Sequence, residues 1–315
     1  MEITNATLMW AAVVALAVTA RRRADHSTLL SATAIAFSLT FNVNAVYLPL
    51  DGVLGGRNLL DLLSNALLVG GIYFLSRAAL RAVHGPKYSS PVLRIGLGVT
   101  LVAVVVTFFL IEQDRSSTTF MLDFGSQVAA ALYSSILFTY VGVVMAFTAV
   151  TCLRYRPSMS SPGFRIGFAV ISAGCFAAIA LVVVILTMNA LNLAGSNHLA
   201  SVRQLYTPLY VIAIFLLCVG YATPPLYRML ERMRREREGR RAYRALLATR
   251  AALIGPSPES VPAYTTAELH RLTVTVLDFL AANADARPTA EDDAALADAE
   301  RFLARPTVSE PQRAR

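Results

Sequence analysis

The chain has 315 residues, of which 56% are hydrophobic and only 15% are charged, a composition typical of an integral membrane protein. Its formal net charge of +8 is divided unevenly, because residues 1–228 carry 14 basic and 7 acidic side chains whereas residues 229–315 carry 14 and 13. The positive charge therefore belongs to the apolar part. We expect no nucleic-acid partner, since such a partner needs a basic face on a folded domain.

Seven apolar stretches in residues 1–228 are long enough to span a membrane. A helix needs ~20 mostly apolar residues to cross the ~30 Å hydrocarbon core. The fourth stretch is the marginal one, because at 1.5 Å per residue its 17 residues reach about 26 Å, the low end of spanning length. In chain order the predicted spans are Thr4–Ala20, Leu29–Leu50, Leu59–Leu80, Ile95–Ile111, Val128–Leu153, Ile166–Leu193 and Leu205–Tyr221.

The basic residues of the connecting segments predict the orientation. Arg57, Arg115 and Arg203 lie on one side of the alternating connections, and eleven basic residues lie on the other. The positive-inside rule places the richer side in the cytoplasm. The N-terminus is then outside and the C-terminus cytoplasmic in a bacterial plasma membrane. The eleven are Arg21, Arg22, Arg23, Arg77, Arg81, Lys87, Arg94, Arg154, Arg156, Arg165 and Arg228.

Residues 229–306 predict a small helical domain in the cytoplasm. A basic segment continues the seventh span and ends at Gly255-Pro256. Thr265 with Glu268 forms the pattern of a capping box, and Thr289 after Pro288 caps another helix. The expected fold is therefore all-α: seven transmembrane helices over residues 1–228, a helical domain over 229–306 and a disordered tail over 307–315.

The basic segment after the seventh span predicts contact with lipid headgroups. Clustered arginines just inside a membrane attract anionic lipid. Interleaved Glu231, Glu236 and Glu238 offer i, i+4 pairs that favour a solvated helix instead. The candidate lipid-contacting residues are Arg232, Arg234, Arg235, Arg237, Arg240 and Arg241.

Polar residues at the outer ends of the spans predict a ligand-binding cavity that opens outward. Asp61 is the only acid within a predicted span, and it shares a helix face with Ser64 and Asn65. A simpler interpretation is an interfacial acid that reaches water. The candidate ligand-binding residues at similar depth are Asn42, Asn44, Asp61, Asn65, Tyr133, Asn189, Tyr206 and Tyr210.

Small residues in the spans are typical of close helix packing. Gly163-x-x-x-Gly167 and Gly174-x-x-x-Ala178 have the spacing that lets helices approach, either within one chain or in a homodimer. Gly70-Gly71 indicates another close crossing. We expect Pro49, Pro224 and Pro225 at helix ends or in loops. Only Pro208 enters a span, near its outer end, so the spans show no interruption of the kind found in transporters.

Motifs for catalysis or cofactor binding are not apparent. The sequence has no Gly-rich phosphate loop, serine elbow or HExxH motif, and its cysteines and histidines lack metal-binding spacing. Its single lysine, Lys87, falls in a loop, which excludes a retinal Schiff base within the bundle. We therefore expect no enzyme, no cofactor and no metal.

The architecture resembles an actinobacterial family of seven-transmembrane integral membrane proteins, commonly labelled as transporters. In sequence the resemblance rests on Arg244-Ala-Leu-Leu, Ala267-Glu-Leu-His-Arg-Leu and Ala294-Ala-Leu-Ala-Asp-Ala. The segment Thr273-Val-Thr-Val-Leu-Asp278 departs from the basic-acidic stretch usual there. The family implies a cytoplasmic domain of unknown function and no catalytic residues.

Three functions agree with these features. The first is a sensor or signal transducer, in which the seventh helix relays an outer or membrane signal to the cytoplasmic domain and its protein partner. The second is a small-solute transporter that uses Asp61 and Asn65. The third is a structural subunit that packs beside another membrane protein through the faces of Gly163 and Gly174.

Overall fold

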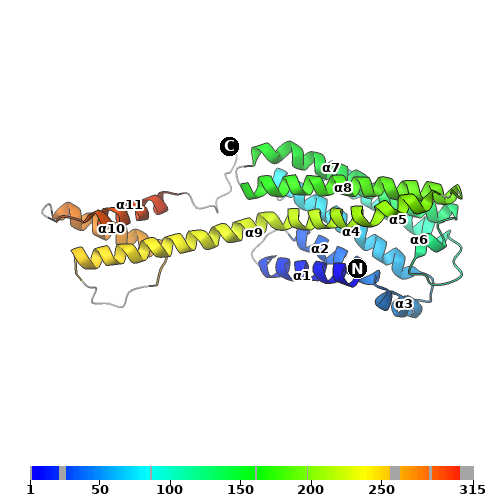
Figure 1. Cartoon of the computed structure of the whole chain (residues 1–315), viewed down its shortest axis with the longest axis horizontal. Coiled ribbons are helices and arrows are strands. Elements are labelled where there is room, and N and C mark those ends of the chain that lie inside the picture. The colour runs from blue at the N-terminus through cyan, green and yellow to red at the C-terminus, as the bar shows by residue number, and fades with distance from the viewer. Residues whose placement is uncertain are drawn as a thin grey trace. The chain divides into compact units, whose positions relative to one another are not determined.

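The structure, a computed structural model, describes residues 2–20, 26–85, 87–159, 162–196, 198–255, 263–283 and 286–305. All regular elements in these ranges are helices (Figure 1), which confirms the all-α prediction. The chain divides into two compact units, Met1–Pro224 and Pro225–Arg315, called here the membrane unit and the C-terminal unit. The predicted disordered tail, residues 307–315, lies outside the described residues.

The helices of the membrane unit match most of the predicted spans. In the part of the chain that the structure describes, five helices are long and apolar enough to cross a membrane, or six if the bent pair α2–α3 counts as one span. The chain is therefore a multi-pass membrane protein, and a seventh span, formed by α1, remains a prediction. The elements are α1 (Glu2–Ala20), α2 (Ser27–Phe41), α3 (Asn44–Val53), α4 (Leu59–His84), α5 (Pro91–Phe109), α6 (Phe120–Asp123), α7 (Val128–Tyr155), a 3₁₀ turn (Arg156–Ser158), α8 (Pro162–Leu193) and α9 (Leu199–Leu253).

The second predicted span is not one straight helix. The chain breaks after α2, and α3 turns away from it by 85°. Val43 at the break has extended backbone, and Pro49 lies inside α3 and not in a loop. The expectation of uninterrupted spans was therefore wrong here, because an Asn-Val-Asn sequence allows a turn that hydropathy does not reveal.

Helix α7 is the centre of the membrane unit. It packs against α4, α5 and α8. Leu137, Val144 and Ala149 are almost completely buried along it, as is Val104 of α5. The burial of apolar groups on three sides of α7 fixes the positions of its polar side chains, including Tyr133.

Glycines allow the closest helix approaches. A Cβ built on Gly71 would lie 2.7 Å from Cγ1 of Ile35 and 3.3 Å from the carbonyl oxygen of Ser31, so α4 crosses α2 at this point. A Cβ on Gly174 would lie 3.0 Å from the backbone nitrogen of Leu217, and one on Gly167 would meet Pro224. The small-residue face of α8 is therefore used within the chain, against α9.

Gly71→Ala is expected to destabilise the membrane unit by about 1 kcal/mol, because overpacking a tight contact costs about 1–3 kcal/mol and the Ile35 side chain can partly shift. The free energy of unfolding in mixed micelles measures this. Gly70→Ala is the matched control, since nothing lies within 4 Å of a Cβ at Gly70. Equal losses in both variants would contradict a close crossing at Gly71.

The C-terminal unit is a three-helix bundle. The last part of α9 packs with α10 (Thr266–Ala282) and α11 (Ala290–Ala304). Helix α9 passes through Pro224 and Pro225, which were expected at a helix end, and continues to Leu253, which confirms that the basic segment extends the predicted seventh span. The core consists of Ala242, Tyr243, Leu246, Leu269, Leu272, Val276, Ala299 and Phe302.

Both predicted caps of this unit are present. The Thr265 hydroxyl accepts from Glu268 N at 3.1 Å. Thr289 and Asp292 form a complete capping box, in which Thr289 N donates to Asp292 Oδ2 at 3.0 Å. Hydrogen bonds from the Thr289 side chain and backbone hold the pKa of Asp292 below its usual value.

Thr289→Ala is expected to destabilise α11 by about 1 kcal/mol, the typical loss of an N-cap. Because the folded pKa of Asp292 is depressed, its contribution is present above the unfolded value of about 3.9 and is lost as pH falls through the folded pKa. Hydrogen exchange of α11 amides at neutral and acidic pH measures both effects. A difference between variant and wild type that grows on acidification would contradict this account.

Candidate functional site

The most concentrated polar assembly of the membrane unit is at one end of it, where α3, α6 and the start of α4 lie (Figure 1). It joins the α3–α4 connection to the segment between α5 and α7. Two fully buried polar residues, Asp51 of α3 and Asn58 just before α4, organise it. We call this group of contacts the Asp51–Asn58 assembly.

The side chain of Asp51, which belongs to α3, caps the N-terminus of α4. Its carboxylate accepts from Asn58 N at 3.0 Å, from Leu60 N at 3.2 Å and from the Ser116 hydroxyl at 2.6 Å. The backbone N–H groups at a helix start have no partners within the helix, and the helix dipole favours a negative charge there. This explains how a carboxylate with no exposed surface is held.

Asn58 links the two connections through its side chain. Its Oδ1 accepts from the Tyr47 hydroxyl at 3.0 Å and from Ser117 N at 2.6 Å, and its Nδ2 donates to Gln113 Oε1 at 3.0 Å and to the Arg115 carbonyl at 2.9 Å. Its backbone is left-handed, with φ of 53°. Asparagine tolerates this conformation better than most residues, so both its backbone and its side chain suit this position.

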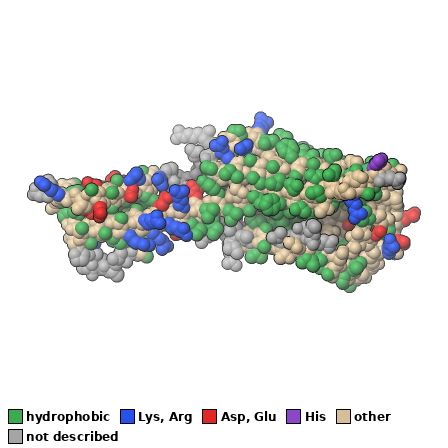
Figure 2. Space-filling view, viewed as in Figure 1, with side chains coloured by type: hydrophobic (Ala, Val, Ile, Leu, Met, Phe, Trp, Pro, Cys, Tyr) green, Lys and Arg blue, Asp and Glu red, His purple; other side chains and the backbone are tan. Residues whose placement is uncertain are grey.

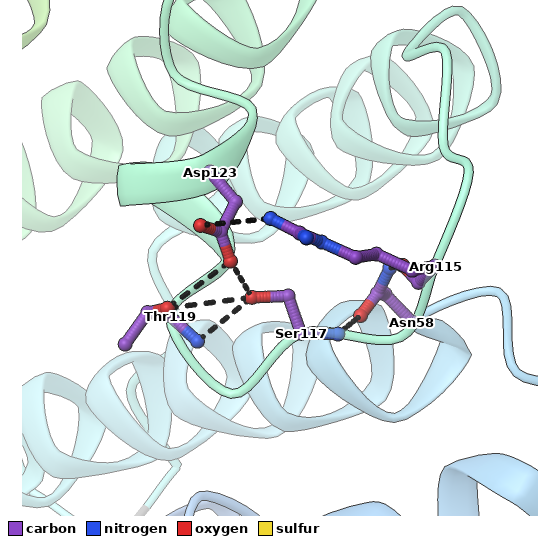
Figure 3. Close-up of polar contacts among 5 residues, drawn as sticks. All are labelled: Asn58, Arg115, Ser117, Thr119 and Asp123. Carbon is purple, nitrogen blue, oxygen red and sulfur yellow. Dashed lines mark hydrogen bonds and ion pairs between the residues drawn. The ribbon is translucent and has the colours of Figure 1, made fainter.

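The outer edge of the assembly contains a second carboxylate (Figure 3). The Ser117 hydroxyl donates to Asp123 Oδ2, Thr119 Oγ1 donates to the same oxygen at 3.1 Å, and Arg115 lies 3.4 Å from the other oxygen. The bond from Ser117 is the largest cause that holds the pKa of Asp123 below its usual value, with smaller effects of Thr119 and Arg115. Asp123 is therefore an anion, and its contacts with Ser117, Thr119 and Arg115 stabilise the conformation of the segment between α5 and α7.

The predicted intramembrane acid, Asp61, lies in the first turn of α4. Asp61 Oδ2 accepts from Asn65 Nδ2 and from the Tyr133 hydroxyl, each at 2.9 Å, and Asn65 Nδ2 is also 2.9 Å from the Tyr133 hydroxyl. The Asp61 backbone N–H donates to the Asn58 carbonyl at 3.0 Å, which connects this triad to the assembly. The rings of Phe108 and Phe120 pack around Tyr133.

The other predicted cavity residues lie in separate groups. Asn42 is 2.5 Å from Ser64 Oγ, Asn189 donates to Ser134 and Ser135, and Asn44 is exposed at the start of α3. Tyr206 and Tyr210 stack on each other along α9, with ring centroids 5.9 Å apart. Of the eight predicted residues, Asp61, Asn65 and Tyr133 thus form one hydrogen-bonded group.

The candidate lipid-contacting arginines do not have equal surroundings. Arg235 stacks over the Phe302 ring at 5.5 Å and donates to the Arg305 carbonyl, so it belongs to the bundle. Arg234 is paired with Glu238 at 3.0 Å. The remaining four, Arg232, Arg237, Arg240 and Arg241, are exposed.

Sequence reasoning missed Asp51, Asn58 and Asp123 because they lie outside the apolar stretches. A usable signal was present: an acid and an asparagine flank a Gly-rich turn between two spans, at residues 51–58. In the described residues no group of three or more His, Cys, Asp or Glu side chains could hold a metal ion. No family model, curated protein or solved structure matches the chain.

Proposed function

We propose that the protein is a membrane sensor or signal transducer, with an input at the Asp51–Asn58 assembly and an output in a cytoplasmic C-terminal unit. The observation that carries the proposal is that one helix supplies residues to the packing of both units. Leu217 and Gly220 of α9 pack against α8 in the membrane unit, and Tyr243 and Leu246 of α9 lie in the core of the C-terminal unit.

The assembly is suited to receive a signal, because a few hydrogen bonds between two connecting segments determine its conformation. Ser116 and Ser117 come from the segment after α5; Ser116 bonds to Asp51 of α3, and Ser117 bonds to Asn58, just before α4. A ligand or a change in the membrane that moves this segment leaves a buried carboxylate with fewer donors. Asp51 would then keep only its two backbone donors, and the loss of a hydrogen bond to a charged group costs roughly 1.5–3 kcal/mol, so the start of α4 must respond.

Hydrogen exchange of the full-length protein in lipid nanodiscs tests the relay. Asp51→Asn removes the buried charge with little change of shape, and we expect it to change the protection of α10 and α11 amides by about threefold or more, equivalent to roughly 0.6 kcal/mol of coupling, within the range seen along coupled networks. Unchanged protection of the α10 and α11 amides would contradict the proposed relay.

Thr107→Val is the matched control for this experiment. Thr107 lies near the end of α5, and its hydroxyl bonds only to carbonyls of its own helix, at 2.8 and 3.1 Å, among the contacts of the described residues. We expect the same α10 and α11 protection as in the wild type. An effect as large as that of Asp51→Asn would show that any disturbance of the membrane unit changes the protection of α10 and α11. It would then argue against a specific relay from the assembly.

A solute transporter is the second candidate, favoured by the break between α2 and α3. Transporters often bind their substrates where spanning helices are interrupted. Here Asn42, next to the break, contacts Ser64 of α4, one residue before Asn65 of the Asp61 triad. Proton flux into proteoliposomes, followed with a pH-sensitive dye, should then fall about tenfold or more in Asp61→Asn, as expected when an intramembrane carboxylate carries the ion. Flux equal to that of protein-free vesicles would exclude proton transport.

A further inference from the structure

We propose that one face of α9, just beyond its membrane-spanning part, is a docking surface for anionic phospholipid. The face consists of Leu226, Leu230, Met233, Arg237, Arg241 and Arg244. These residues follow one another by three or four positions, so they form a single stripe along the helix. All six are exposed. We call them the apolar-basic stripe.

The stripe lies opposite the bundle core. Core contacts of α9 are made at Arg235, Gly239, Ala242 and Leu246, a second series with the same spacing. At 3.6 residues per turn, Arg237 is about 200° from Arg235 around the axis. The C-terminal unit therefore uses one side of α9 for its own core and leaves the opposite side to solvent or lipid.

The order of residues along the stripe matches the layers of a membrane surface. Its first half is apolar and exposed, with Leu226 at 55%, Leu230 at 64% and Met233 at 40%. Its second half is purely basic. Arg237 and Arg241 lie about 6 and 12 Å beyond Met233 at 1.5 Å per residue. That distance covers the headgroup layer and about one Debye length, where lipid charge is still felt.

The acid nearest the stripe is paired with arginines outside it. Glu238 lines the same hollow as Arg237 and Arg241, but its carboxylate bonds to Arg234 at 3.0 Å and to Arg305 at 3.2 Å. Among the described residues, no ion pair joins the stripe arginines to an acid. Figure 2 shows the blue Lys and Arg side chains gathered along this part of α9. The positive charge of the stripe thus remains available to lipid phosphate.

Anionic lipid is the occupant because apolar and basic groups follow each other on one helix that continues a spanning segment. An acidic protein would match the arginines but not the exposed leucines and methionine before them. A zwitterionic bilayer would match the apolar half alone. Only a negatively charged membrane surface matches both halves.

The test uses full-length protein in vesicles of phosphatidylcholine with a minority of phosphatidylglycerol. Electron paramagnetic resonance of spin-labelled lipids gives the preference of the protein boundary for phosphatidylglycerol over phosphatidylcholine. We expect a clear preference that weakens with added salt. Arg237→Gln/Arg241→Gln/Arg244→Gln should lower it by at least about fivefold, the contribution of a single basic residue near the surface.

Two control proteins make the result specific. Arg271→Gln/Arg287→Gln/Arg301→Gln removes three exposed charges elsewhere in the C-terminal unit and should leave the preference unchanged. Arg237→Lys/Arg241→Lys/Arg244→Lys keeps the charge of the stripe, so this variant should retain the preference for phosphatidylglycerol. Equal preference for both lipids in the wild type, equal losses in the two Gln variants, or a Lys variant that behaves like the stripe Gln variant would each overturn the proposal.

Discussion

Asn58→Ala should destabilise the membrane unit by about 3–4 kcal/mol, because each hydrogen bond lost at a buried site costs on the order of 1 kcal/mol. The Asn58 side chain makes four such bonds, to Tyr47, Gln113, Arg115 and Ser117. The free energy of unfolding in mixed micelles measures the loss. Because the bonds join two connections distant in sequence, proteolysis of the segment between α5 and α7 should also accelerate.

Asn58→Gly separates the two roles of this residue. Glycine adopts a positive φ freely but makes no side-chain hydrogen bonds, so this variant keeps the backbone and loses the link. We expect it to be nearly as unstable as Asn58→Ala. A glycine variant as stable as the wild type would mean that the left-handed backbone, and not the hydrogen-bonded assembly, explains the asparagine.

Gly239→Val should disrupt the C-terminal unit selectively. A Cβ on Gly239 would overlap the Tyr264 hydroxyl and lie 2.8 Å from Cζ of Phe302. Tyr264 can move at moderate cost, but Phe302 is itself buried between α9 and α11. A branched side chain therefore cannot fit, and we expect a loss of about 3 kcal/mol or more, the upper end of overpacking effects.

Hydrogen exchange of the full-length protein measures the effect of Gly239→Val. Protection of α10 and α11 amides should fall by at least about a hundredfold, which corresponds to ~3 kcal/mol of local stability, whereas α7 and α8 should keep their protection. Glu236→Ala, at an exposed position one turn earlier, is the control and should change neither. Loss of protection in both units would contradict the division into separate compact units.

The long elements of the membrane unit could be predicted because apolar length alone determines a spanning helix. The predicted start at Leu59 and the predicted stretch from Val128 agree with α4 and α7, and the caps at Thr265 and Thr289 are confirmed. Local composition determines these features. The break after α2 could not be predicted in this way, because the flanking residues are apolar on both sides of Asn42-Val43-Asn44.

The site was predictable only where its members lie within predicted spans. Asp61 and Asn65 are four residues apart, so their contact follows from helix geometry, and the common depth of Tyr133 suggested the third member. The burial of Asp51 and Asn58 depends instead on Ser116 and Ser117, which come from a connection far along the chain. Hydropathy and periodicity carry no information on such contacts between loops.

The central claim, that the input assembly and the C-terminal unit lie on opposite sides of the membrane, is tested by reporter fusions in a bacterial host. The seven-span account predicts that reporters after Gly55, Ser117 or Asn197 read external, and that reporters after Arg23, Lys87, Arg156 or Arg315 read cytoplasmic. The decisive pair is Ser117, within the assembly, and Arg315, at the end of the C-terminal unit. Opposite sides for these two agree with transduction across the membrane, whereas the same side for both would contradict it.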